Sequence, residues 1–253
     1  MSTKMQIAPR PTTNDQVAST IREWLRAQQV FSTLSNTIID DLASIIQEAT
    51  LPGAAVLFEQ GADATHLYVL LQGQVALWGA APDGTSAVVE VVHPPDHFVL
   101  APILTQLPHL TSARAVTPVR LLMIEADGLR HLLEREASLA NALFRAEAMS
   151  FREMVRQVQD LKLRNAAERL ACYLLGLVED PNATGASFRL PFEKGLLAAR
   201  LGCRQENLSR AFATLRSVGV ETHGARVILH NIPALRAFAG TDEKSGSVIG
   251  RAA

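Results

Sequence analysis

The chain has few of the residues that form covalent cross-links. Only two of its 253 residues are cysteines, Cys172 and Cys203, and they are too far apart to form a C-x-x-C pair. This excludes a disulfide framework and the cysteine clusters that hold zinc or iron–sulfur centres. No apolar run approaches the length of about 18 residues that a membrane-spanning helix needs. The first residues also lack the apolar core of a secretory signal. These absences predict a cytoplasmic protein without a membrane partner.

The sequence also lacks the motifs of common enzyme classes. It has no Walker loop, GxSxG elbow, HExxH zinc motif or dinucleotide-binding glycine fingerprint. The neighbouring carboxylates Asp40 and Asp41 fall in a predicted helix, where adjacent side chains diverge by about 100° and cannot converge on a substrate. We therefore expect no catalytic residues and no metal site.

Charge is unevenly distributed along a chain whose net charge is only −1. Residues 161–240 carry 11 Lys and Arg against 6 Asp and Glu, a net +5, whereas residues 1–160 carry 11 against 17, a net −6. This asymmetry is typical of a nucleic-acid-binding module joined to a module that does not bind nucleic acid. Chance segregation of charge is the alternative.

The basic half contains the pattern of a helix-turn-helix. Gly202 stands where a tight turn needs a residue tolerant of positive φ. After it, Leu208, Phe212 and Leu215 repeat at the spacing of one buried helix face. The other face carries Gln205, Glu206, Ser209 and Arg210, whose side chains can reach base edges or phosphates in a major groove. An amphipathic helical hairpin with a solvated polar face is the alternative.

A glycine-capped helix end at Gly219 is followed by a predicted β-hairpin over residues 220–229, in the position of a wing. With this hairpin, residues 164–239 resemble the winged DNA-binding domain of the Crp/Fnr family of bacterial transcription regulators. The resemblance implies that Glu206, Ser209 and Arg210 read a TTGAT half-site, as in the Fnr branch. We expect Lys194, Arg204 and Arg226 to contact phosphates, since each is a cation near the predicted recognition helix or wing.

The acidic half contains short strand patterns separated by turns, which favours a barrel or roll over a parallel sheet. The glycine pattern from Phe58 and Gly61 to Gly73 and Val75 is similar to the cyclic-nucleotide-binding β-roll of the same family. Helices are predicted over residues 17–27, 36–48, 127–134, 137–161 and 166–178, and Ser35 or Asn36 can cap the second of them. The predicted class is α+β, a β-roll followed by a long dimerisation helix and a winged helix-turn-helix. The predicted boundaries are 1–14 (disordered), 15–135 (sensor), 136–163 (dimerisation helix and hinge), 164–240 (DNA-binding) and 241–253 (disordered).

The long helix carries an apolar seam at coiled-coil spacing. The seam runs through alternating steps of four and three residues; its members are Phe144, Ala148, Phe151, Val155 and Val158. This seam predicts a homodimer, as expected for a helix-turn-helix protein that reads a two-fold DNA site. A broad buried face in a monomer is the alternative. A second stripe, Leu139, Leu143, Met154 and Leu161, is expected to pack on the roll.

The resemblance also indicates which effectors of the family this chain has the residues to bind. Family members that bind cyclic AMP use a Gly-Glu pair for the ribose and an Arg-Ser pair for the phosphate. Alignment on Phe98 and Arg114 places Leu100-Ala101 and His109-Leu110 there, so a buried phosphate would lack its cation. The iron–sulfur cluster of the Fnr branch needs N-terminal cysteines, and none precedes Cys172. We therefore expect neither cyclic AMP nor an iron–sulfur cluster.

Two other kinds of effector stay open. Some family members bind haem and sense carbon monoxide or nitric oxide, and His93, His97 and His109 could supply an axial ligand. Ordinary surface histidines are the alternative. Cys203 precedes the recognition helix, whose positive end favours a thiolate, so it is a candidate redox sensor, unless it is a structural thiol in the turn.

Together these patterns predict a homodimeric regulator that binds double-stranded DNA and, if it activates transcription, RNA polymerase. A regulator without an effector, controlled by its expression level, and a regulatory module that does not bind DNA are the alternatives. The effector, the target genes and the direction of regulation do not follow from the sequence.

Overall fold

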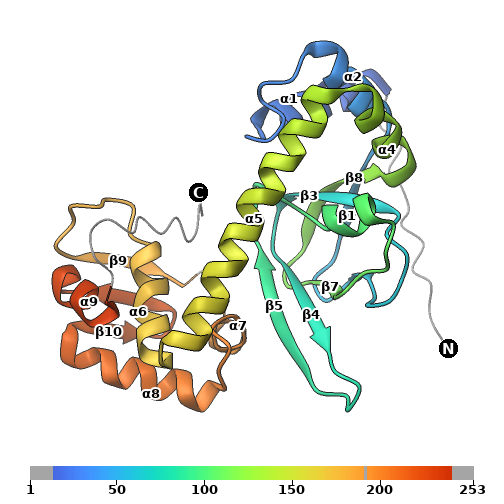
Figure 1. The fold of residues 1–253 in the computed structure, drawn as a ribbon. Helices are drawn as coiled ribbons and strands as arrows, with labels where there is room; N and C mark the ends of the chain where they lie inside the picture. The colour runs from blue at the N-terminus through green and yellow to red at the C-terminus, as the bar shows by residue number, and fades with distance from the viewer. Residues whose placement is uncertain (1–13, 191–192, 241–253) are drawn as a thin grey trace. The chain divides into compact units, whose positions relative to one another are not determined.

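The computed structural model describes residues 14–190 and 193–240. The predicted disordered ends lie outside these ranges, apart from Asn14, where the first helix begins. The chain divides into two compact units, Met1–Arg152 and Glu153–Ala253 (Figure 1).

The first unit is a β-roll flanked by helices. Its elements in chain order are α1 (Asn14–Ala27), α2 (Asn36–Ser44), β1 (Ile46–Leu51), β2 (Val56–Phe58), β3 (His66–Gln72), β4 (Val75–Ala80), β5 (Ser86–Val92), β6 (Asp96–Phe98), α3 (Leu100–Thr105), β7 (Ser112–Ala115), β8 (Val119–Glu125), α4 (Ala126–Arg135) and the first part of α5 (Ala137–Leu163). Two four-stranded sheets, β1-β8-β3-β6 and β2-β7-β4-β5, have antiparallel pairings throughout.

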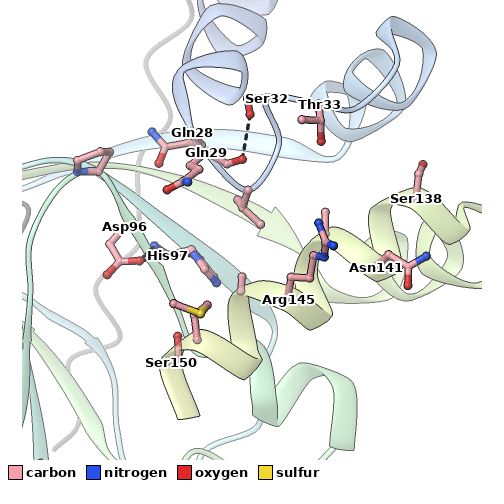
Figure 2. A pocket seen from close by; sticks show the side chains of 15 residues that line it. Gln28, Gln29, Ser32, Thr33, Asp96, His97, Ser138, Asn141, Arg145 and Ser150 are labelled. Atoms are coloured by element: carbon pink, nitrogen blue, oxygen red, sulfur yellow. Dashed lines mark hydrogen bonds and ion pairs between the residues drawn. The ribbon is translucent and has the colours of Figure 1, made fainter. Parts of the chain in front are cut away.

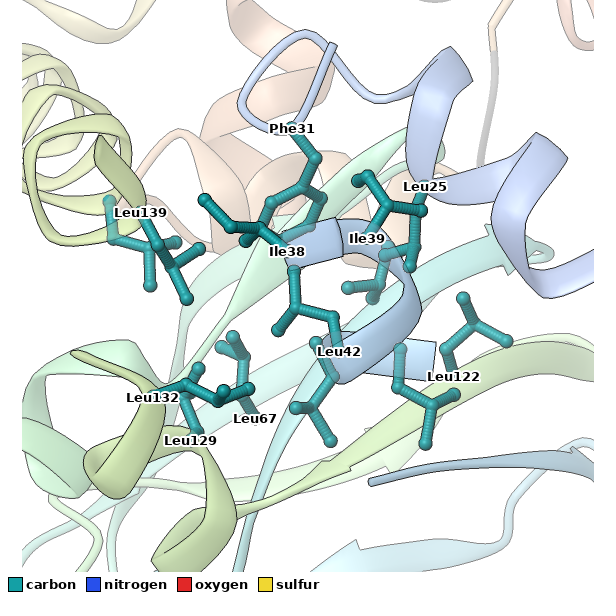
Figure 3. Close-up of a cluster of buried hydrophobic side chains, with 14 of the residues drawn as sticks. Leu25, Phe31, Ile38, Ile39, Leu42, Leu67, Leu122, Leu129, Leu132 and Leu139 are labelled. Atoms are coloured by element: carbon teal, nitrogen blue, oxygen red, sulfur yellow. The ribbon is translucent and has the colours of Figure 1, made fainter. Parts of the chain in front are cut away.

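Alternation along the strands of the first sheet supplies two separate cores. In β3, Tyr68 and Leu70 face the second sheet and join the interior of the roll. Leu67, Val69 and Leu71 face outward and are buried against helices. Figure 3 shows this outer core, where side chains of α1, α2 and α4 meet Leu67 and Leu122 of the sheet. A sheet buried on both faces explains why β3 is a continuous apolar run.

Gly73 fixes the turn between β3 and β4. Its φ is +86°, and a Cβ atom there would lie 2.2 Å from the Pro118 carbonyl oxygen. Only glycine fits this combination of backbone conformation and close approach. The glycine is part of the sequence pattern that resembles the family's roll.

The predicted helix over residues 36–48 is wrong at its end. Ser35 caps α2 as predicted, accepting a hydrogen bond from the Ile38 amide at 3.3 Å. The helix ends at Ser44, however, and residues 46–48 begin β1, which pairs along its whole length with β8. Long-range pairing outweighs the helical pattern here, and an ion pair between Glu48 and Arg120 joins the two strands.

The second unit contains the rest of α5 and a helix-turn-helix with a three-stranded sheet. Its elements are α6 (Ala166–Gly176), β9 (Ala186–Arg189), α7 (Lys194–Arg200), α8 (Gln205–Leu215), a 3-10 turn (Arg216–Val218), β10 (Val220–His223), β11 (Arg226–Leu229) and α9 (Ile232–Ala239). The sheet order is β10-β11-β9, so the predicted hairpin gains a third strand. The predicted fold class is confirmed.

The break between α5 and α6 has a clear local cause. Asn165 accepts hydrogen bonds from the amides of Ala167 and Glu168, and the Glu168 carboxylate accepts from the Asn165 amide in return. This reciprocal capping box begins a new helix directly after α5. None of the helices in the described ranges has both the length and the apolar character needed to cross a bilayer.

Candidate nucleic-acid interface

The turn of the helix-turn-helix is held by backbone and side-chain contacts. Gly202 has φ +61°, and a Cβ atom there would lie 2.5 Å from a methyl carbon of Leu161. Arg169 of α6 donates from Nε to the Leu201 carbonyl at 2.9 Å. The Cys203 amide donates to the Ala198 carbonyl at 2.9 Å. These contacts fix the direction in which α8 leaves the turn.

The recognition helix α8 separates its faces as predicted. Its buried side chains are Leu208, Ala211, Phe212 and Leu215. The exposed face carries Gln205, Glu206, Ser209 and Arg210. Glu206 and Arg210 are one helical turn apart, and neither forms an ion pair within the described part of the chain. Both charged groups are therefore available to a partner.

Two of the predicted base-reading side chains have contacts inside the domain. The Ser209 hydroxyl donates to the Gln205 carbonyl at 3.0 Å, a bond along the helix itself. The Gln205 amide lies so close to α7 that a Cβ atom on Gly195 would approach its nitrogen to 2.7 Å. Gly195 thus leaves room for the Gln205 side chain beside the first turn of α7.

The predicted phosphate contacts lie on three elements around α8. Lys194 begins α7, and its ammonium is 5.6 Å from the centre of the Phe212 ring. Arg204 is the exposed residue before α8. Arg226 is exposed on β11 and pairs in register with Arg189 of β9. Each is a cation that can reach an anion outside the domain.

Sequence reasoning missed Arg189, because β9 was not predicted. Arg189 and Arg226 are both exposed and directly opposite each other in neighbouring strands. Like charges in this arrangement repel each other and destabilise the sheet. A phosphate group near the wing would relieve that repulsion. The signal in the sequence was the apolar–polar alternation of Ala186–Arg189, which is only four residues long and contains a single strong strand former, Phe188.

The base of the wing contains a carboxylate held between two imidazoles. Glu221 of β10 is 2.7 Å from His223 Nε2 and 2.9 Å from His230 Nε2. The two hydrogen bonds hold the pKa of Glu221 below its usual value, and the bond to His230 has the larger effect. The Glu221 carboxylate is therefore engaged within the wing.

These geometries agree with comparisons to known proteins. Residues 48–136 match the family model for a cyclic nucleotide-binding domain, and residues 168–238 match the model for a Crp-like helix-turn-helix domain. The "CRP-like cAMP-activated global transcriptional regulator" of Mycobacterium tuberculosis is 24% identical over 82% of this chain and 94% of its own. The "Anaerobic regulatory protein" of Aggregatibacter actinomycetemcomitans is 25% identical over 86% of each chain. The chain belongs to the Crp/Fnr family.

A solved structure supports the same fold for this Crp/Fnr family member. FixK2 from Bradyrhizobium japonicum has a TM-score of 0.67, with 21% identity over 77% of this chain and 97% of that one. By its match to the Crp-like helix-turn-helix model and its likeness to the two curated regulators, the chain is a DNA-binding transcription regulator of the Crp/Fnr type. This family is one of transcription regulators rather than enzymes.

The interior of the roll in this Crp/Fnr protein is apolar and aromatic. Phe98, Tyr68 and Phe58 stack with ring centres 5.2 and 5.6 Å apart, and His109 stacks on Phe58 at 3.8 Å. His109 is 3% exposed, and burial lowers its pKa below the usual value, so the ring is neutral at neutral pH. A buried cyclic phosphate needs a cation, and the described residues buried inside the roll include none. The buried interior of the roll, as far as the structure describes it, thus supplies no cation for a cyclic phosphate.

The other predicted effector residues do not converge on His109. Phe98 points into the roll, and His97, its neighbour in β6, points to the opposite face of the sheet. Leu100 is buried in the outer core, whereas Ala101 is exposed. His93 precedes β6 and is partly exposed. The structure does not bring the three histidines to one haem face, and no described group of three His, Cys, Asp or Glu side chains could hold a metal ion.

The expected thiolate at Cys203 is wrong in its premise. Burial of this side chain raises the pKa of the thiol, and Arg169 opposes that effect only in part. Cys203 lies one residue before the helix cap Arg204, and its own amide is already hydrogen-bonded within the turn. Burial disfavours the charged thiolate and is the larger of the two effects on this group. The structure favours a turn-building thiol over a reactive one.

The predicted seam of α5 is exposed. Phe144 is 72% exposed and Phe151 63%, and Val155 and Val158 are also open to solvent. Ala148 lies on the same exposed stripe. The second predicted stripe is half wrong: Leu139 and Leu143 are buried in the outer core, but Met154 and Leu161 are exposed. The outer core ends at Leu143, so later apolar residues of α5 have no sheet to cover.

Proposed function

We propose that this protein is a homodimeric, sequence-specific regulator that binds a palindrome of TTGAT-like half-sites in the cytoplasm. The observation that carries the proposal is the combination of two exposed surfaces. One is the polar face of α8 with Glu206 and Arg210, and the other is the apolar seam of α5. A folded monomer rarely leaves aromatic side chains such as Phe144 and Phe151 so open, so a second copy of α5 is the expected cover.

The roles of the α8 residues follow from their chemistry. Arg210 can make a bidentate contact to guanine, and Glu206 can accept from a cytosine amine. Lys194, Arg204 and Arg226 supply charge to the phosphate backbone, with Arg189 beside Arg226 in the wing sheet. RNA polymerase is a further partner if the protein activates transcription.

A gel-shift titration tests the proposal. The full chain is mixed with a duplex containing two inverted TTGAT half-sites and, separately, with a duplex of scrambled sequence at the same salt concentration. We expect tighter binding to the palindrome by a factor of about 1,000 or more. Equal affinity for the two duplexes would contradict sequence-specific recognition, and sedimentation of the free protein as a monomer would contradict the dimer.

A second candidate, control by expression level without an effector, is supported by the aromatic stack that fills the roll. Calorimetry with cyclic AMP tests the negative part of this statement, and micromolar binding would overturn it. Haem with nitric oxide stays a prediction from the sequence. A Soret band in the purified protein, lost when His93, His97 and His109 are replaced, would support haem control; its absence after haem titration would leave the unliganded regulator.

A further inference from the structure

A hollow lies outside the roll, on the helix-covered side of the first unit. It has a volume of about 950 Å³. Its walls are the loop after α1, the start of β6 and the first half of α5 (Figure 2). Residues 28–33, 95–97 and 138–150 supply the lining, which includes Gln28, Asp96, His97, Asn141 and Arg145. The size is in the range of small-molecule sites.

Gln28 is an unusual residue in this wall. Its side chain is only 5% exposed, and the side-chain nitrogen has no hydrogen-bond partner among the described residues. A buried amide without a partner is costly, and such groups in native proteins are normally satisfied by protein, water or ligand. Gln28 lines the hollow, and an acceptor atom placed beside this nitrogen would satisfy it.

Arg145 supplies a positive charge to the same hollow. Figure 2 shows its side chain rising from α5 towards the loop after α1. It forms no ion pair within the described part of the chain, whereas Arg130 and Arg135 are each paired with an aspartate. A guanidinium that is free of internal carboxylates is suited to bind a carboxylate or phosphate in a bidentate manner.

The side of the hollow next to β6 is polar but not cationic. The Asp96 carboxylate accepts a hydrogen bond from the His97 amide at 2.8 Å and keeps its other oxygen for a donor. Burial lowers the pKa of His97, although Glu147 acts in the opposite direction, so a neutral imidazole faces the hollow. A hydroxyl group satisfies this side, because it can donate to Asp96 and accept from Gln28.

We propose that this hollow is a binding site for a small hydroxylated organic anion. Its carboxylate or phosphate binds Arg145, and its hydroxyl groups meet Gln28 and Asp96. The site lies outside the interior of the roll, so it does not depend on the residues that align with the nucleotide contacts of the family. Nor does it depend on the proposed dimer or DNA sequence.

Calorimetry and thermal melting of the full chain test the site. The probes are malate and citrate, which carry carboxylates, and glycerol 3-phosphate and glucose 6-phosphate, which carry phosphate. Glycerol is the neutral control. We expect either the two carboxylate probes or the two phosphate probes to bind, with one molecule per chain, and to raise the melting temperature. The pair that binds identifies the acidic group that the site prefers. If none of the four anions binds at millimolar concentration, the proposal is overturned.

Variants locate the binding. Arg145→Gln removes the cation and is expected to weaken binding about tenfold or more. Arg114→Gln is the matched control, because Arg114 is an exposed arginine on β7 that does not line the hollow. Gln28→Leu removes the unsatisfied amide and should also weaken binding, with melting of the free variant as the check on folding. Equal weakening by Arg145→Gln and Arg114→Gln would show nonspecific charge attraction and overturn the site. Since no DNA is present, failure here leaves the proposed function intact.

Discussion

Replacing Arg210 by alanine separates the base-reading role of α8 from its structural role. Arg210 is exposed, and its guanidinium forms no ion pair within the described ranges. Besides the bonds of the helix, its backbone carbonyl accepts a hydrogen bond from the Thr214 hydroxyl. Alanine is the better helix former. The free energy of unfolding should therefore change by no more than about 0.5 kcal/mol, as for surface substitutions in general.

The effect on DNA binding should be much larger. A bidentate arginine–guanine contact discriminates by about 1–3 kcal/mol against the wrong base. This corresponds to a loss of roughly fivefold to 150-fold in affinity for the specific site. Binding to scrambled duplex should fall much less, because that binding depends on phosphate contacts. The ratio of specific to nonspecific affinity is therefore the quantity to measure.

The assay is a gel-shift titration of the wild type and Arg210→Ala on both duplexes at one salt concentration. Arg204→Ala is the comparison variant, because Arg204 is also exposed at α8 but is expected to contact phosphate. It should weaken both complexes equally and flatten the dependence of affinity on salt. If Arg210→Ala leaves the ratio unchanged, or if both variants behave alike, the assignment of Arg210 to base reading is refuted.

Three further predictions concern assembly and stability. Phe151→Glu should sediment as a monomer that still folds, because the Phe151 side chain is 63% exposed and does not belong to the core of the chain. Arg152→Glu is the control and should leave the dimer intact. A Phe151→Glu variant that stays dimeric would place the interface elsewhere. Gly73→Ala should cost about 2 kcal/mol or more of unfolding free energy, whereas Gly61→Ala, with φ +83° but open space around it, should cost about 1 kcal/mol; equal losses in denaturant titration would show that the Pro118 contact is unimportant. Burial lowers the pKa of His109 below 6.5, so the unfolded chain binds the proton more readily and stability should fall as the pH drops below about 6.5; His109→Phe should flatten that fall, and an unchanged pH profile would refute the assignment.

Local patterns predicted those elements whose stability is decided locally. The apolar spacing of α8, the glycine at the turn and the polar cap of α2 each act over a few residues, and each is found where the sequence indicated. The seam of α5 was visible for the same reason, since its period lies within one helix. The base-reading candidates followed because they lie on the face opposite the buried one.

Elements that depend on distant partners were not predictable in this way. β1 follows a helix and contains Gln47 and Glu48, so only its pairing with β8 makes it a strand. β9 likewise becomes a strand by pairing with β11, and the Arg189–Arg226 pair follows from that register. Cys203 shows a related error: its neighbours in sequence predicted a lowered pKa, but three-dimensional burial reversed the direction.

The hollow beside α5 shows why a ligand site can leave little trace in a sequence. Its walls come from three segments that are far apart in the chain, and none of them contains a recognised motif. In the sequence, Arg145 is an ordinary arginine within a predicted helix, and Gln28 is an ordinary polar residue that follows a predicted helix. Their significance comes from folding, which buries the side-chain nitrogen of Gln28 without a hydrogen-bond partner and places Arg145, which forms no ion pair within the described residues, at the same hollow. The search for a small-molecule site on this chain therefore extends to this hollow as well as to the interior of the roll.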